Sequence, residues 1–164
     1  NSIRKVVKLC CTSIEKGGKI IFAGNGGSAA DAQHFAAELM IRFEKNRSSI
    51  ASIALNSDSC SITACANDFG YDQIFKRQLE GLATKNDVFI AISTSGKSKN
   101  ILKALEFSKK NRILSILLTG YNKPDIQKSC DYIIEIPSTN TARIQEGHSL
   151  VGHILCGMIE KNFM

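Results

Sequence analysis

The sequence lacks the features that mark membrane-spanning and exported chains. Its 164 residues include no tryptophan and two prolines. The longest apolar runs, such as Val88–Ile92, are far shorter than the roughly 20 residues that span a bilayer. The segment Asn1–Leu9 has neither the apolar stretch nor the cleavage pattern of a signal peptide. We therefore expect a cytoplasmic protein with no membrane partner.

Cysteine patterns of metal centres or disulfide frameworks are also missing. No C-x-x-C pair occurs, and Cys60 and Cys65 have no second pair to match them. Free thiols, mostly buried, in a reducing cytoplasm are the expected state. The six cysteines are Cys10, Cys11, Cys60, Cys65, Cys130 and Cys156.

The charge distribution does not resemble that of a nucleic-acid-binding protein. The net charge is +6, but no basic run exceeds two residues and no aromatic residues are interleaved with the basic ones. We expect no nucleic-acid partner. A mildly cationic surface instead suits an anionic small molecule.

Short apolar strands alternate with helical stretches along the chain. The run Val88–Ser93 is continuously apolar, as expected of a parallel strand that is buried on both faces. This alternation predicts an α/β doubly wound three-layer sandwich, with a central parallel sheet of about five strands, in one domain over residues 1–164. The expected strands are Lys19–Ala23, Ser49–Leu55, Val88–Ser93, Ile113–Thr119 and Tyr132–Ile136, and the expected helices are Gly27–Arg42, Ser98–Lys110 and Thr141–Phe163. Asn1–Leu9 is typical of the middle or end of an amphipathic helix, so part of the N-terminal helix is expected to be missing.

Two polar turns follow strands, at the sheet edge where such folds bind ligands. The first, Gly24-Asn25-Gly26-Gly27-Ser28, allows close approach of a ligand to the backbone, but it lacks the G-x-G-x-x-G order of a dinucleotide loop. The second, Ser93-Thr94-Ser95-Gly96-Lys97-Ser98, is not a Walker loop. It offers four hydroxyls at a helix start, where capping needs only one, and this favours a phosphate site.

Two helices carry residues that could share one catalytic centre. His34 and Glu38 are four residues apart and lie on one helix face. Gln145 and His153 are eight residues apart, about 80° around the axis, so both could face one site. Such a set offers a divalent metal imidazole and oxygen ligands, although each pair, taken alone, is more often an ordinary polar pair than a set of ligands. His148 lies on another side of its helix from His153, and spacing does not choose between them.

Together these segments resemble the phosphoheptose isomerases of the sugar-isomerase (SIS) family. The resemblance rests on residues 24–39, Asn67-Asp68-Phe69-Gly70-Tyr71, Ser93–Gly96 with Ser98, and Arg143–Glu146 with His148 and His153. It implies the SIS fold and an aldose–ketose isomerase that acts on sedoheptulose 7-phosphate in the synthesis of bacterial heptoses for lipopolysaccharide or capsule. It also implies a homotetramer with shared active sites.

The resemblance also implies roles for individual residues. Glu38 and His153 would be the catalytic pair. One zinc ion per subunit would be bound by His34, Glu38, Gln145 and His153. The substrate contacts would be Asn25, Gly26, Gly27, Ser28, Glu38, Asn67, Asp68, Ser93, Thr94, Ser95, Ser98 and Gln145.

One position departs from the family pattern. Ala142 stands where many of these isomerases carry an acidic residue that contacts substrate, which puts one sugar contact in doubt. The alternative is a non-catalytic SIS adaptor that binds the bacterial replication initiator and shares an Ala-Arg-Ile-Gln-Glu segment. That relative lacks the Glu and His at positions 38 and 153 and has Arg in place of Ser95. The isomerase is therefore the favoured prediction.

Overall fold

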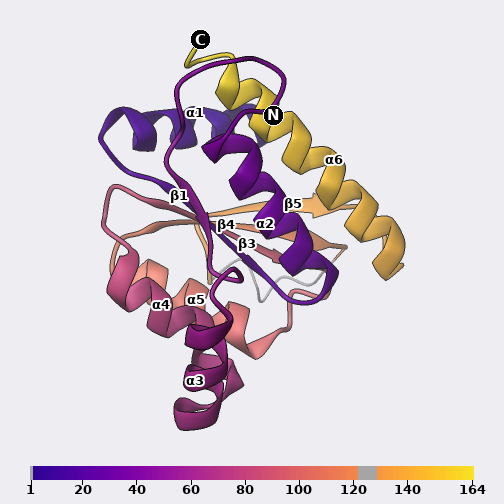
Figure 1. The fold of residues 1–164 in the computed structure, drawn as a ribbon. Coiled ribbons are helices and arrows are strands. Elements are labelled where there is room, and N and C mark those ends of the chain that lie inside the picture. The colour runs from indigo at the N-terminus through magenta and orange to yellow at the C-terminus, as the bar shows by residue number, and fades with distance from the viewer. Residues whose placement is uncertain (1, 122–128) are drawn as a thin grey trace.

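The computed structural model describes residues 2–121 and 129–164. Five strands form one parallel sheet in the order β2-β1-β3-β4-β5 (Figure 1). The strands are β1 (Ile20–Gly24), β2 (Ser52–Ala54), β3 (Val88–Ser93), β4 (Leu114–Gly120) and β5 (Tyr132–Ile136). The helices are α1 (Ser2–Glu15), α2 (Gly27–Met40), α3 (Ser59–Phe69), the 3₁₀ turn η1 (Tyr71–Gln73), α4 (Ile74–Leu82), α5 (Lys99–Lys110) and α6 (Thr141–Glu160).

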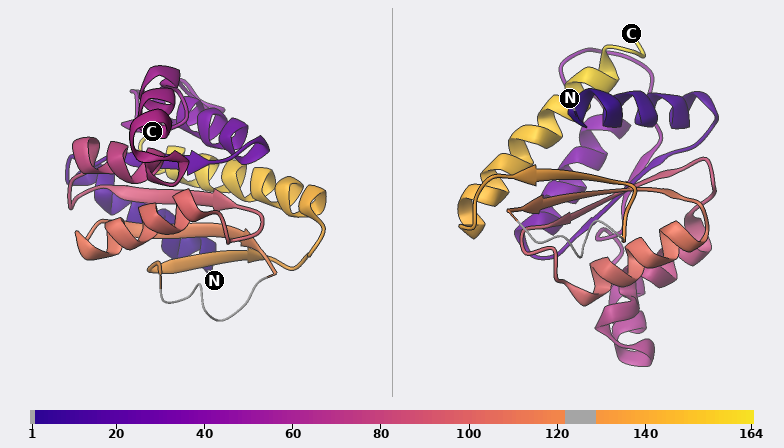
Figure 2. Two further views of the ribbon diagram at one scale, coloured as in Figure 1. Left: turned by 90° about the horizontal axis from the view of Figure 1, so that it is seen from below. Right: turned by 180° about the vertical axis from the view of Figure 1, so that it is seen from behind.

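Helices cover both faces of the sheet and make a three-layer sandwich. Helices α1, α2 and α6 lie on one face, and α4 and α5 lie on the other (Figure 2). Because successive strand residues point to opposite faces, Ile20 and Phe22 join the core on the first face, whereas Ile21 and Ala23 join the second. All six residues of β3 are buried, which explains its uninterrupted apolar run.

The predicted fold class is confirmed, including the number of strands. Each predicted strand exists within three residues of its expected bounds, and the N-terminal segment is helical to Glu15. Helices α3 and α4 were not predicted. For α3 a signal was present, because the Asp58 side chain accepts hydrogen bonds from the N–H groups of Cys60 and Ser61, and Gly70 ends the helix with φ 95°.

The thiols and the helix lengths bear on two other expectations. The described cysteines are all free, and Cys60 alone among them is exposed. Burial raises the pKa of Cys130 to about 11 and that of Cys156 to about 12, so both remain protonated and unreactive at neutral pH. Within the described residues, no helix combines the length and apolar character that crossing a bilayer demands.

Helices α2 and α6 run side by side and parallel, with contacts offset by a nearly constant number of residues. Ser149 donates a hydrogen bond to Asp31 at 2.8 Å, and farther along, His153 lies next to His34. Between these contacts Gly152 faces the ring of Phe35, which is 1% exposed. A Cβ at position 152 would lie 2.0 Å from that ring. The absence of a side chain at Gly152 therefore sets how closely the two helices approach.

We expect Gly152→Ala to separate α2 from α6. The buried Phe35 ring has little room to move, so the free energy of unfolding should fall by about 1–3 kcal/mol. Turnover should fall with it, since His34 and His153 face each other across the same contact. Thermal unfolding and steady-state assays would measure both effects. The control is Gly81→Ala in α4, where an added Cβ meets no atom within 4 Å; it should not destabilise the protein. A Gly152→Ala protein as stable as wild type would contradict this account.

Candidate functional site

The strand order creates a crevice between β1 and β3. These strands are neighbours, but the helices that follow them, α2 and α5, lie on opposite faces of the sheet. Ligands of open α/β sheets bind at such a switch point, outside the carboxyl ends of the strands. Both polar turns, residues 24–28 and 93–98, lie here as predicted.

A pair of amide side chains connects the two turns. Asn25 Nδ2 donates to Asn100 Oδ1 at 2.9 Å, and Asn100 Nδ2 donates to Asn25 Oδ1 at 2.8 Å. The Tyr71 hydroxyl also donates to Asn25 Oδ1, at 3.0 Å. Asn100 is 2% exposed, so a buried side chain holds Asn25 in place. These three residues border a cavity of about 470 Å³ together with Asp72, Ser98 and Lys99.

The helices that begin at this crevice lack side-chain caps, unlike two others in the chain. No side chain caps α2 at Gly26 or α5 at Ser98. By contrast, Asp58 caps α3 and Asn140 caps α6. Capping satisfies free N–H groups at a helix start, so an uncapped start can donate to an anion instead. The ordinary capping interpretation of Ser98 is therefore wrong.

The hydroxyls of the second turn are arranged around its own backbone. Ser93 Oγ lies 3.4 Å from Ser98 Oγ and accepts from the Gly96 N–H at 3.2 Å. Ser95 Oγ accepts from the Lys97 N–H at 3.2 Å. Gly96 has φ 64°, a conformation that glycine adopts without strain. The N–H groups of Gly96 and Lys97 are thus bonded to serine hydroxyls of the turn itself. The turn borders two cavities, one of about 300 Å³ at Thr94, Ser95 and Lys97 and one of about 470 Å³ at Ser98.

Gln145 lies at the first turn of α2, away from His153. A Cβ at Gly27 would lie 2.0 Å from Gln145 Nε2, so the side chain rests directly on the glycine backbone. The eight-residue separation of Gln145 and His153 amounts to about 12 Å along a helix. Within one chain Gln145 therefore lies with the crevice residues.

His34, Glu38 and His153 form a second group, on the outer side of α2 and α6. His34 Nε2 lies 2.9 Å from Glu38 Oε1 and 3.5 Å from His153 Nε2. The ring of Phe43 stacks on that of His153, with centroids 5.7 Å apart and planes at 24°. The side chain of His34 is 50% exposed and that of Glu38 is 22% exposed. A carboxylate and an imidazole that reach solvent next to each other are equipped for acid–base chemistry.

The two groups are separated within a single chain. Gly27 and His34 are seven residues apart, about 10 Å along α2. Asn67 and Asp68 lie at the end of α3, where they are exposed and hydrogen-bond to each other at 2.8 Å. The predicted substrate contacts thus occupy more than one place on the surface of one chain.

The donor atoms of the second group suit zinc in kind and spacing. Imidazole and carboxylate are ordinary zinc ligands, and ligand atoms around a tetrahedral zinc ion are about 3.3 Å apart. The separations of His34 Nε2 from Glu38 Oε1 and from His153 Nε2, 2.9 and 3.5 Å, bracket that value. As placed in the described part of the chain, however, no group of three or more His, Cys, Asp and Glu side chains is arranged to hold a metal ion. The residues fit the metal, and the complete ligand set remains a prediction.

Comparison with known proteins identifies the family. Residues 1–120 match the sequence model of the SIS domain. Phosphoheptose isomerase 2 of Campylobacter jejuni is 52% identical over 161 residues, 98% of this chain and 78% of that protein. The phosphoheptose isomerase of Sulfurimonas denitrificans is 50% identical, over 98% of this chain and 83% of that protein. A solved phosphoheptose isomerase structure from Francisella tularensis superposes with a TM-score of 0.93 at 38% identity, covering 98% of this chain and 85% of the other.

This chain belongs to the phosphoheptose isomerase family. The fold and the enzyme class predicted from its motifs are therefore confirmed, whereas the roles of individual residues stay predictions. Sequence reasoning did not single out Asn100 or Phe43. For Asn100 no spacing rule applied, because its importance follows from the three-dimensional meeting of two turns.

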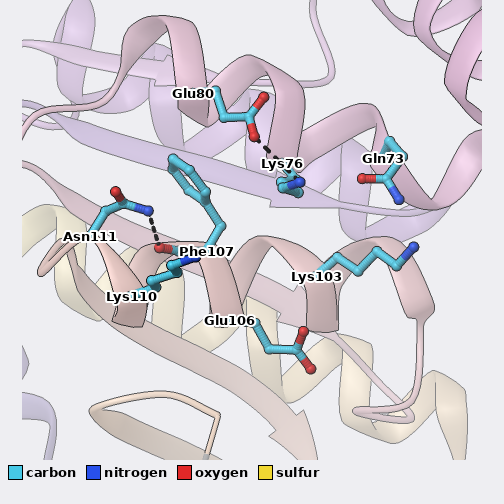
Figure 3. A pocket seen from close by; sticks show the side chains of 8 residues that line it. All are labelled: Gln73, Lys76, Glu80, Lys103, Glu106, Phe107, Lys110 and Asn111. Atoms are coloured by element: carbon cyan, nitrogen blue, oxygen red, sulfur yellow. Dashed lines mark hydrogen bonds and ion pairs between the residues drawn. The ribbon is translucent and has the colours of Figure 1, made fainter.

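A groove on the opposite face of the sheet does not contribute to the isomerase site. It has a volume of about 460 Å³ and lies between α4 and α5 (Figure 3). Lysines and glutamates both line it, and Lys76 pairs with Glu80 at 3.4 Å. Lys103 pairs with Asp72. With its charges balanced in this way, the groove has no marked preference for an anion.

His148 differs from the other two histidines because it is fully buried. It is 0% exposed, and neither ring nitrogen makes a hydrogen bond of ordinary geometry, although the backbone of Thr119 is near enough to act on the ring. Burial lowers the pKa of His148 below its ordinary value of 6.5, although the backbone of Thr119 and the charge of Asp31 act in the opposite direction. The predicted separation of His148 from His153 on α6 is confirmed, and His148 belongs to the core.

We expect His148 to reduce the stability of the folded protein in mild acid. An unfolded chain binds a proton at this histidine below about pH 6.5, whereas the folded chain resists it, so stability falls as pH drops through that window. His148→Phe removes the titrating group and should lessen the loss of melting temperature between about pH 7 and pH 5. Thermal melts at the two pH values measure this, with His34→Asn as the exposed-histidine control. An unchanged acid loss in His148→Phe would contradict the assignment.

Proposed function

We infer that the enzyme interconverts sedoheptulose 7-phosphate and D-glycero-D-manno-heptose 7-phosphate, an aldose–ketose isomerisation that supplies bacterial heptose for lipopolysaccharide or capsule. The observation that carries this inference is the meeting of Glu38, His34 and His153 on two parallel helices, in a chain of this family. We also propose a cytoplasmic location, which the free cysteines support.

The reaction moves a carbonyl between C1 and C2 of the sugar, and two groups can share the proton transfers. We assign to Glu38 the removal of the proton from the carbon beside the carbonyl. Removal of this proton from C1 of the ketose gives an enediolate, and the hydroxyl proton on the C1 oxygen passes to the C2 oxygen. His153 donates a proton to C2, which leaves the carbonyl at C1. The proton taken up by Glu38 returns to His153 before the next turnover. The contact of His34 with both residues holds them in register. Stacking of Phe43 on His153 limits rotation of that ring.

The phosphate belongs in the turn after β3. Ser93, Ser95 and Ser98 supply hydroxyls, and the uncapped start of α5 supplies N–H groups. Fixing the phosphate there orients the reacting end of the sugar, which lowers the entropic part of the barrier. Thr94 borders a neighbouring cavity of about 300 Å³ that also contacts Tyr121 and Thr141.

A zinc ion would be held by His34, Glu38 and His153. Gln145 of the same chain lies about 12 Å away along α6, so a Gln145 ligand would have to come from a second subunit. When bound, such an ion polarises the substrate carbonyl and stabilises the negative charge that develops on its oxygen. The ion also competes with the proton for the Glu38 carboxylate.

The non-catalytic adaptor is the less favoured function. Binding a protein partner does not call for a carboxylate and an imidazole in contact at the surface. Glu38 and His153 both contact His34, and this favours catalysis over a role in protein binding alone.

Assay with sedoheptulose 7-phosphate tests the proposed reaction and its catalytic pair. Wild type should form the aldose phosphate, and chelator treatment should reduce the rate until zinc is returned. Glu38→Gln and His153→Asn should each lower turnover by about 10²-fold or more, while sugar-phosphate binding is retained better. Near wild-type turnover in either variant would end its assignment. Full activity in metal-free protein would remove the metal from the scheme and leave the pair untouched.

We further propose a homotetramer whose active sites are shared between subunits. The family resemblance supplies the number four, and the surface of α2 and α6 supplies a physical reason. Ile41 and Leu150 are 68% and 63% exposed beside the catalytic group, and Met40 and Ile154 are each 38% exposed. A second copy on this face would bury apolar area and exclude water from the reaction. It could also bring its own crevice residues to Glu38 and His153, which one chain keeps apart.

Light scattering should give a mass four times that of the chain. Leu150→Asp places a charge in the proposed contact, so it should produce smaller species and lose activity. Leu82→Asp is the matched control, since Leu82 is 44% exposed on α4 at the opposite face; it should stay tetrameric and active. A stable, fully active wild-type monomer would contradict the proposal.

A further inference from the structure

A buried ion pair lies behind the catalytic group, where the C-terminal end of α6 meets the loop after α2. The side chains of Arg47 and Glu160 are each 2% exposed, and Arg47 Nε lies 3.2 Å from Glu160 Oε1. Two buried charges are costly unless they are paired and hydrogen-bonded on most sides. Their neighbours therefore show what this pair holds in place.

The Glu160 carboxylate holds the loop backbone. Its two oxygens accept hydrogen bonds from the N–H groups of Phe43 and Glu44, both at 2.9 Å, and of Lys45 at 3.1 Å. Burial alone would raise the pKa of Glu160, but these three donors and Arg47 outweigh it and hold the pKa below its ordinary value. The carboxylate is therefore ionised at neutral pH and fixes three consecutive loop residues.

One of those residues reaches the catalytic group. The Phe43 ring stacks on the His153 ring, and it also lies against Gly157, one turn later on α6, where an added Cβ would be 3.2 Å from Cε1 of the ring. Glu160 thus sets the loop backbone from which Phe43 extends over the imidazole. Rotation of the His153 ring would have to displace a side chain that is anchored through its own N–H.

Arg47 acts on the other partner. Its Nη2 donates to the carbonyl oxygen of Glu38 at 2.8 Å, and its Nη1 donates to the carbonyl of Ser48 at 2.9 Å. Since α2 ends at Met40, the Glu38 carbonyl is among the last of the helix and has no further turn to accept from. A buried cation at this end also suits the helix dipole.

We propose that Glu160 and Arg47 are positioning residues for the isomerase reaction: one ion pair orients His153 through Phe43 and anchors the helix end that carries Glu38. The Glu38 carboxylate and the His153 imidazole come from distant parts of the chain, and the same buried ion pair positions both. This inference rests on the proposed roles of Glu38 and His153.

Three variants test the proposal. Glu160→Gln replaces one acceptor oxygen with an amide NH2 group, which cannot accept hydrogen bonds from the loop N–H groups, and Phe43→Leu removes only the ring. Each should lower kcat about tenfold or more with little change in KM. Both should shift the ring-proton resonances of His153, because the ring current of Phe43 is moved or lost. Phe43→Tyr keeps the ring and should restore both values.

The control is Asp87→Asn, which weakens a buried carboxylate of similar kind just before β3. Asp87 is 2% exposed and accepts from the N–H groups of Lys19 and Thr84 at 2.8 and 2.7 Å. It should lower the melting temperature but leave kcat and the His153 resonances unchanged.

The outcomes separate this inference from the proposed function. Wild-type kcat in Phe43→Leu, His153 resonances that do not move, or an equal loss of kcat in Asp87→Asn would overturn the positioning role. If Glu160→Gln fails to fold, Phe43→Leu and Phe43→Tyr still decide the matter. Turnover retained in His153→Asn would instead overturn the catalytic assignment. The His153 ring resonances of wild type, Phe43→Leu and Phe43→Tyr would still show whether Phe43 holds the ring.

Discussion

The close approach of α2 and α6 is the constraint on which the proposed catalytic group of His34, Glu38 and His153 depends. Phe35 fills the space that Gly152 leaves open, and Asp31 receives a hydrogen bond from Ser149 in the same interface. These contacts fix the axial register of two parallel helices. Given that register, His153 must lie beside His34, and Gln145 must lie on Gly27. If α6 were shifted by one residue along α2, the same side chains would face solvent but would not meet.

The polar residues around the sheet have two different roles. Asp58 and Asn140 complete helix starts and add stability. At the crevice, Gly26 and Ser98 leave the starts of α2 and α5 without a side-chain cap. Some helix stability is given up there, and N–H groups remain available to an anion. Helix α4 also starts without a side-chain cap, at Gln73, so a missing cap indicates a ligand site only together with the position of α2 and α5 at the crevice.

Much of the fold and part of the site could be predicted from the sequence, for reasons that differ by residue. The buried strand Val88–Ser93 is recognisable because both its faces are apolar. His34 and Glu38 share a helix face, which periodicity reveals. The distance of Gln145 from His153 was harder to judge, since angle around an axis says nothing about rise along it. Glu160 could not be found at all, because its partners at positions 43–47 lie more than 110 residues away.

The proposed catalytic residues lie far apart along the chain, and this has a consequence for synthesis on the ribosome. His34 and His153 are 119 positions apart, and α6 follows all five strands. A nascent chain can therefore pair its strands while Phe35 and the rest of the buried α2 surface still wait for their covering helix. During that interval an apolar stripe is open to wrong partners. The proposed acid–base group of His34, Glu38 and His153 can assemble only after α6 has docked.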